Sequence, residues 1–254
     1  MAADLPEPAN DLDELVRDLL AEPAYAQTRR HPRKTQPDEV IPILEDLYAA
    51  HDQAARHLPV LAEKMGHSIA CFKGCSECCN ELVAVTHGEA HTIARWLLEP
   101  AQDALRARFL PRARAWVDAT GASATRALDH LEVGNQETYL RLRKEHALQR
   151  LMCPVNEEGA CTFYPVRPLI CRLPYIVDTS EHCAPRPEGG AQAQQISFPA
   201  YEQFADRARQ LLSGLQGALG REPRERLPLA RAVLEALDAL TPADVVVDSD
   251  SDEA

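Results

Sequence analysis

Hydrophobic residues recur at helical spacing along most of this chain, in segments that proline, glycine or polar stretches separate. The spacing predicts a helix over residues 37–65 that kinks or ends near Pro59, because proline lacks the amide hydrogen that a helix needs. A second helix is predicted to begin after Thr86 and to end before Pro100. Thr86 and Glu89 fit a capping box, in which two residues satisfy each other's backbone amides at the start of a helix.

The second half of the chain has the same helical spacing. It predicts helices over residues 101–119, 124–151, 204–219 and 229–240, and Gly134 marks a break in the second of them. Two short, partly β-branched stretches, 68–71 and 82–86, predict extended segments that pair with each other. We find no internal repeat and no alternation of strands with helices. The predicted fold class is therefore mostly α, a single-domain helical bundle.

Composition divides the chain into three parts. Residues 1–36 read as an N-terminal extension and a polar, proline-broken linker. Residues 37–240 hold the predicted helices and form the domain, and residues 241–254 read as an acidic, disordered tail.

The charge balance and the hydropathy exclude several partners. Lys and Arg number 27 and Asp and Glu number 39, so the net charge of −12 argues against nucleic acid, which selects clustered basic side chains. The acidic start does not resemble a signal peptide, and no apolar run approaches the roughly 20 residues of a membrane-spanning helix. We therefore expect a cytoplasmic protein with neither nucleic-acid nor membrane partners.

Cysteine is the residue type with the most informative pattern. One run, CFKGCSECC, is followed about 80 residues later by a second, CPVNEEGACTFYPVRPLIC. Together they hold Cys71, Cys75, Cys78, Cys79, Cys153, Cys161 and Cys171. Disulfides or free buried thiols are the alternatives, but the cytosol keeps thiols reduced, and closely spaced reduced thiols are typical of metal ligands. The sequence thus predicts that two cysteine-rich loops converge on a metal or iron–sulfur site, with a metal ion as the partner.

The number of thiols bears on the kind of centre. All-thiolate sites suit either Zn(II) or an iron–sulfur cluster such as [4Fe-4S], and each takes four cysteines. Seven or eight thiols therefore mean two centres, or one centre with spare thiols. Adjacent side chains diverge, so we expect Cys78 and Cys79 not to bind the same ion together. Cys183, His87 and His91 remain open as further ligands.

Two arginines flank the last thiol of the second run. Arg167 and Arg172 could neutralise a thiolate-rich centre or bind a carboxylate or phosphate of a ligand, and we assign them to cofactor binding. The alternative is that each pairs with one of the many acidic residues.

The two cysteine runs together resemble the YkgJ-like cysteine-cluster family, described as a zinc- or iron-chelating domain. The likeness covers residues 68–178, and its features include Cys153-Pro154, Gly159 with Cys161, Arg167-Pro168 and Cys171-Arg172. It implies metal chelation. One relative by this domain, the flagellin lysine N-methylase, looks like an iron–sulfur protein that uses S-adenosylmethionine, which makes the same cofactor admissible here.

Three functions follow from these observations. The first is a metal-binding protein of the cysteine-cluster type, and the second is a cluster-dependent enzyme that uses S-adenosylmethionine. The third is a protein that stores or delivers metal. Residues 71–78 also match the radical S-adenosylmethionine spacing, but the flanks read as helices, and that motif leaves the second cysteine run unexplained.

Overall fold

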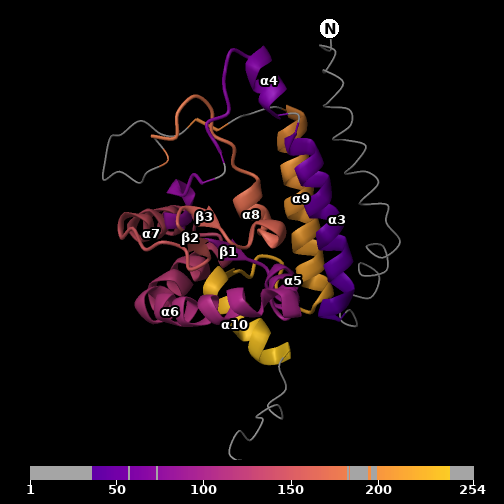
Figure 1. The fold of residues 1–254 in the computed structure, drawn as a ribbon, viewed down its shortest axis with the longest axis vertical. Coiled ribbons are helices and arrows are strands. Elements are labelled where there is room, and N and C mark those ends of the chain that lie inside the picture. The colour runs from indigo at the N-terminus through magenta and orange to yellow at the C-terminus, as the bar shows by residue number, and fades with distance from the viewer. Residues whose placement is uncertain are drawn as a thin grey trace, which may run out of the picture.

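The computed structural model describes residues 36–56, 58–72, 74–181, 183, 194–195 and 199–240. The described chain folds as one mostly helical domain (Figure 1), as the hydrophobic spacing predicts. Both the predicted extension, up to residue 35, and the predicted acidic tail lie outside the described residues.

Helices account for most of the elements, and each strand is two residues long. The α-helices are α3 Pro37–Ala55, α4 Leu58–Lys64, α5 His87–Leu97, α6 Asp103–Glu132, α7 Gln136–Leu148, α8 Leu169–Arg172, α9 Pro199–Ala218 and α10 Leu229–Leu240. The strands are β1 Ala84–Val85, β2 Asn156–Glu157, β3 Ala160–Cys161 and β4 Leu227–Pro228. The 3-10 turns are η2 Glu77–Asn80, η3 Pro100–Gln102 and η4 Tyr164–Val166. Among the described residues, no helix is long and apolar enough to cross a bilayer.

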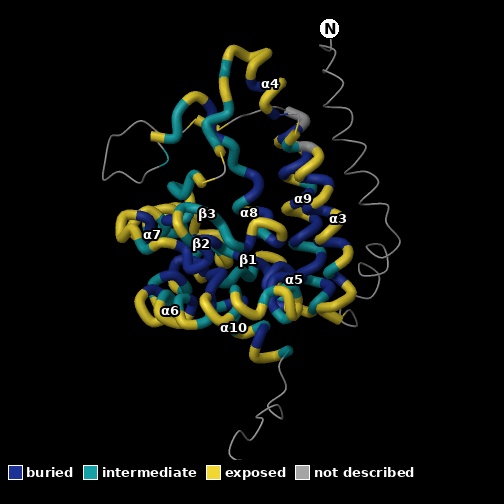
Figure 2. Tube along the Cα trace, viewed as in Figure 1, coloured by how far each residue is buried: buried dark blue, intermediate teal, exposed yellow. Residues whose placement is uncertain are grey.

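One layer of the domain consists of α3 and α9, which lie side by side along its long axis (Figure 1). Buried and exposed positions alternate along both helices at helical spacing (Figure 2), so each turns one apolar stripe inward. Leu44 and Leu47 of α3 and Phe204 and Leu211 of α9 belong to the same buried cluster. Leu169 of α8 joins this cluster, which brings the end of the second cysteine run against the helical layer.

A second core forms where α5, α6 and α10 meet. Ile93 of α5, Phe109 of α6 and Val233 of α10 are all buried in it. Beside this core β1 pairs antiparallel with β4, so that Ala84 faces Pro228. The C-terminal part of the chain is thereby attached directly after the first cysteine run.

Glu89 connects the two cores through a buried carboxylate that is 2 % exposed. It forms the predicted capping box: Glu89 N donates to Thr86 Oγ1 over 3.1 Å, and Thr86 N donates to Glu89 Oε2 over 2.9 Å. Its other oxygen accepts a 2.8 Å hydrogen bond from Leu169 N at the start of α8. One side chain therefore caps α5 and also fixes the helix that carries Cys171.

Three predictions about the elements have clear outcomes. The chain does break near Pro59 and at Gly134, whose φ of +76° suits glycine. The predicted helices 101–119 and 124–151 are wrong as separate elements, because α6 runs continuously through residues 120–123. The hydroxyl groups of Thr120 and Ser123 donate to carbonyls of this helix, and α6 packs on α10, which outweighs the weak helix propensity of that stretch.

The predicted pairing between residues 68–71 and 82–86 is also wrong. Ile69 bridges to Val177, and Ala84–Val85 pairs with Leu227–Pro228. Both stretches are extended as expected, but their partners are distant in sequence and could not be read from local pattern.

Candidate metal centre

The two cysteine runs lie against each other in the structure. Cys153 N donates a 2.7 Å hydrogen bond to Cys79 O, which joins the end of the first run to the start of the second. Gly159 has a φ of +83°, and a Cβ built on it would come within 3.1 Å of Gly74 O. Glycine is therefore required for the close approach of these two loops.

Four of the thiols belong to one buried group. Cys153 is 7 % exposed and is part of the core formed by α5, α6 and α10, and Cys79, Cys161 and Cys171 pack against that core. Asn156, which faces Cys161 across β2 and β3, donates a 3.3 Å hydrogen bond from Nδ2 to Cys79 Sγ. One buried amide side chain thus lies between the two runs and contacts sulfur.

Burial and mutual repulsion keep most of these thiols protonated. Burial, together with the neighbouring Cys161 and Cys78, raises the pKa of Cys153 to about 12. Burial also raises the pKa of Cys171 well above its usual value, together with Cys153, Cys78 and Cys161. Thiolates at these positions require a compensating positive charge.

The remaining thiols lie toward the surface. Cys71 Sγ accepts a 3.3 Å hydrogen bond from Ile176 N, and the pKa of Cys71 is raised by burial and by Cys75 and Cys78. Burial raises the pKa of Cys183 to about 11, and Cys71, Cys75 and Cys78 add to that rise. The sequence left Cys183 open, and the structure brings it into electrostatic range of the first run.

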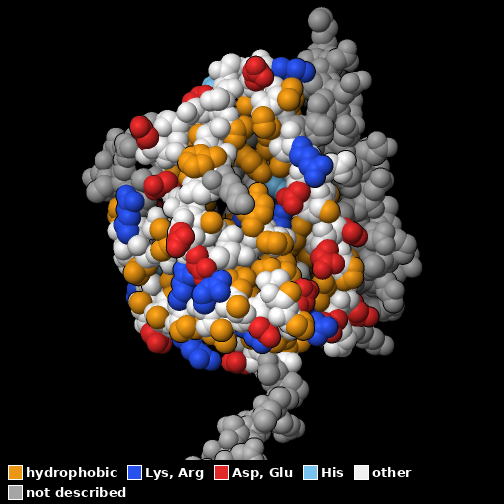
Figure 3. Space-filling model, in the orientation of Figure 1, with side chains coloured by type: hydrophobic (Ala, Val, Ile, Leu, Met, Phe, Trp, Pro, Cys, Tyr) orange, Lys and Arg blue, Asp and Glu red, His pale blue; other side chains and the backbone are white. Residues whose placement is uncertain are grey.

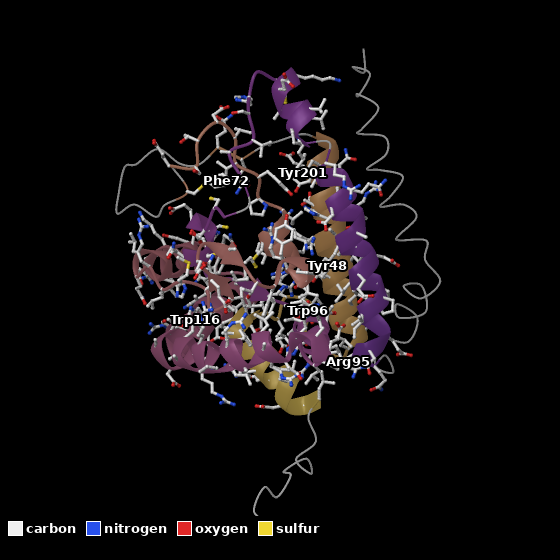
Figure 4. The ribbon with its side chains drawn as sticks, viewed as in Figure 1. Tyr48, Phe72, Arg95, Trp96, Trp116 and Tyr201 are labelled. Atoms are coloured by element: carbon white, nitrogen blue, oxygen red, sulfur yellow. The ribbon has the colours of Figure 1, made fainter. Side chains whose placement is uncertain are left out.

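Cys78 interacts with both groups of thiols. It is the exposed member of the adjacent pair, and its thiol donates a hydrogen bond to the sulfur of Cys79. That hydrogen bond is the main cause of the lowered pKa of Cys79, and the hydrogen bond from Asn156 lowers the pKa as well. Figure 4 shows sulfur atoms in the region between the labelled Phe72 and Trp96, where these loops meet.

The donor set fits a thiophilic metal in its chemistry. All eight cysteines are unpaired, so the disulfide alternative is not the form described. Among the described residues, no group of three or more His, Cys, Asp or Glu side chains already has the arrangement that would hold a metal ion. The thiols are therefore near one another without forming a ready-made coordination sphere in the described part of the chain.

Arg167 provides positive charge beside the thiols. It partly offsets the rise in the pKa of Cys71, Cys78, Cys161 and Cys171, which come from both runs. Its guanidinium lies 5.2 Å from the centre of the Tyr164 ring and has no hydrogen bond or ion pair within the described part of the chain. Both roles foreseen for Arg167, neutralising thiolates and binding an anionic ligand, stay open to it.

Arg172 has a different environment. Its side chain is 3 % exposed and donates to Arg167 O over 2.6 Å, to Pro165 O over 2.8 Å and to Asp52 Oδ1 over 2.5 Å. It also lies over the Tyr48 ring, 4.5 Å from the centroid. Arg172 therefore ties the second cysteine loop to α3, and its donors are engaged by protein groups.

The candidate histidines have carboxylate partners. His87 Nε2 lies 2.7 Å from Glu225 Oε1, and His91 Nε2 lies 2.9 Å from Asp38 Oδ1. These partners belong to other elements than the cysteine loops, so the structure does not bring His87 and His91 together with the thiols.

Sequence reasoning missed His51, which is buried behind the second cysteine loop. Tyr201 OH donates to Leu173 O over 2.9 Å, and His51 Nε2 lies 3.2 Å from the same tyrosine oxygen. His51 falls on the apolar stripe of α3, and that spacing was the only signal for its burial. Burial lowers the pKa of His51 to about 4, and the nearby Arg172 lowers it too.

This burial predicts an acid-sensitive fold. The ordinary pKa of 6.5 applies in the unfolded chain, so between pH 6.5 and about 4 the unfolded chain binds a proton that the folded protein does not. The free energy of unfolding should therefore fall by up to about 3 kcal/mol as the pH decreases through this window. Urea unfolding at several pH values measures it, and His51→Gln should flatten the pH profile. An equally steep profile in the variant would rule out His51 as the source.

Comparisons of the chain with protein-family models, with curated proteins and with solved structures find no match. The likeness to the YkgJ-like family therefore rests on the cysteine pattern alone, and it remains a prediction.

Proposed function

We propose that this protein binds metal through the cysteines of its two loops, as an iron–sulfur protein or a zinc protein. The observation that carries the proposal is that thiols from segments about 80 residues apart lie in one electrostatically coupled region, unpaired and mostly protonated. A thiophilic cation is the ligand that such a set accommodates best, because it relieves both the repulsion and the burial of charge.

The chain's own residues supply three things to such a centre. Sulfurs of both loops are the donors, and the Asn156 amide hydrogen bonded to Cys79 Sγ would orient that donor. Arg167 would offset the negative charge of the bound thiolates. A reducing, cytoplasmic setting is part of the proposal, since it keeps the thiols free.

The test is anaerobic purification followed by metal and acid-labile sulfide analysis and an absorption spectrum. We expect either stoichiometric iron and sulfide with absorption near about 400 nm, or stoichiometric zinc without colour. Metal-free protein that is folded and monodisperse after reconstitution with both Zn(II) and Fe(II) plus sulfide would contradict the proposal. Loss of bound metal to a weak chelator with the fold intact would favour a storage or delivery role.

A second candidate function is favoured by Arg167. The Arg167 guanidinium stacks on the Tyr164 ring but has no hydrogen bond or ion pair among the described residues, so it could bind the carboxylate of S-adenosylmethionine, as in a cluster-dependent methyl transfer. Figure 3 shows hydrophobic side chains gathered around a hollow near α8. Calorimetric titration of the metal-loaded protein with S-adenosylmethionine separates this function from the first. Arg167→Ala should weaken the binding of S-adenosylmethionine at least tenfold. If neither the wild-type protein nor the variant binds S-adenosylmethionine, the enzyme function is excluded.

A further inference from the structure

We propose that α7 is a hinged helix that moves away from the first cysteine run when His146 takes up a proton. α7 packs on η2, the turn that carries Cys78 and Cys79, so its movement would release that turn. The inference goes beyond metal binding and does not depend on it, because it concerns how one helix is held to the domain.

Few buried side chains hold α7 in place. Of its 13 residues only His146 and Ala147 are buried, and both lie in its last turn. Tyr139 and Leu142 are partly buried against the small core around α6. An element that buries so little apolar surface opens at a lower free energy than the rest of the fold.

The interface beneath α7 contains buried polar atoms that make no hydrogen bond. His146 is 3 % exposed, yet neither of its ring nitrogens has a partner among the described residues. The same holds for the indole nitrogen of Trp116, whose ring meets that of His146 edge to face with the centres 5.6 Å apart. Oε2 of Glu77, in η2, is the fourth such atom in the described part of the chain. Water would satisfy these atoms once α7 moves, which favours opening at this interface.

The backbone on both sides of α7 suits a hinge. Gly134 separates α6 from α7 with a φ of +76°, and Arg150 follows the last turn with a φ of +55°. The side chain of Asn135 caps the helix by accepting a 3.2 Å hydrogen bond from Thr138 N. α7 therefore keeps its own N-terminal cap when it moves, and the turns at its two ends absorb the change in direction.

Two charge contacts attach this part of the chain to the first cysteine run. Arg143 of α7 donates to Glu81 Oε2 over 2.7 Å. Arg150 lies 3.9 Å from Glu77 Oε2, which is too long for a hydrogen bond. Both contacts are at the surface in part, where ion pairs contribute little, so they do not lock the helix in place.

Protonation of His146 favours the open position. Burial lowers the pKa of His146 from 6.5, and Glu81 acts in the opposite direction with a smaller effect. From α6 the histidine faces the neutral ring of Trp116, and Arg143, on its own helix, is paired with Glu81. The open form regains the ordinary pKa and binds a proton that the closed form does not. The closed form is therefore favoured fully above pH 6.5, and the opening equilibrium rises by up to about tenfold for each pH unit below it.

Hydrogen–deuterium exchange of the full-length protein, followed by mass spectrometry, measures this opening. Exchange rates are corrected for the intrinsic pH dependence of amide exchange. Peptides that cover α7 should then exchange faster at about pH 5.5 than at about pH 7.5, by up to about tenfold. An unchanged corrected rate in these peptides would overturn the inference.

Three histidine variants identify the group that titrates. His146→Gln should exchange α7 at the same corrected rate at both pH values, and His146→Phe takes its place if circular dichroism shows that the glutamine variant does not fold. His130→Gln is the matched control on α6, because His130 is only partly buried, and it should keep the wild-type response. His51→Gln should keep it too, which separates movement of α7 from unfolding of the whole domain. A response that persists in the His146 variant would overturn the inference.

Discussion

Replacing Phe163 by alanine is expected to reduce the free energy of unfolding by about 3–5 kcal/mol, the usual cost of deleting a fully buried aromatic ring. Phe163 is completely buried two residues after Cys161. Its ring centre lies 4.9 Å from that of Phe109 on α6 and 5.8 Å from that of Trp96 on α5. The ring therefore anchors the second cysteine loop to two helices, and urea denaturation monitored by circular dichroism measures the loss.

The neighbouring aromatic residue is the control for Phe163. Tyr164 is 57 % exposed and contacts Arg167 through its ring face, so Tyr164→Ala should cost only about 0.5–1 kcal/mol. If the two variants were equally stable, the loop would not depend on the Phe163 anchor.

Replacing Arg172 by methionine should cost about 3 kcal/mol, because it removes a buried guanidinium and leaves the loop carbonyls that it contacts without their donor. The guanidinium donates hydrogen bonds to Asp52 and to several loop carbonyls, including Arg167 O and Pro165 O. Methionine fills much of the volume but leaves those acceptors without a donor. The measurement is again urea unfolding, at neutral pH.

Arg167→Met is the matched control, since it changes the same residue type in the same loop. Arg167 has no hydrogen bond or ion pair in the described parts of the chain, so its loss should cost less than about 1 kcal/mol. Equal costs for Arg172→Met and Arg167→Met would contradict the structural role of Arg172.

Local pattern was sufficient for most of the helices and insufficient for the contacts between them. The capping box at Thr86 and the break at Gly134 could be predicted, because each depends on residues a few positions apart. The continuity of α6 could not, because it depends on packing against α10. The partner of Ala84–Val85 is a segment more than 140 residues away, and nothing in a short window indicates it.

The candidate site shows the same division between local and distant information. Thiol spacing identified the two runs, and the structure brings them into contact through Cys79 and Cys153. The different environments of Arg167 and Arg172 could not be read from the sequence, because Asp52 and Tyr48, which engage Arg172, are on α3. His51 is on the apolar stripe that the spacing predicted, but its contact with Tyr201 could not be read from the sequence, because Tyr201 is on α9.

The core that contains Cys153 and packs against Cys79, Cys161 and Cys171 includes Val233 of α10, although the last cysteine of the chain is Cys183. A nascent polypeptide that has emerged only as far as the last cysteine lacks this floor and the β4 strand that pairs with Ala84–Val85. The thiols of this core are therefore not covered until α10 has been synthesised and packed. A metal centre built on these thiols, as proposed, would close only after that step.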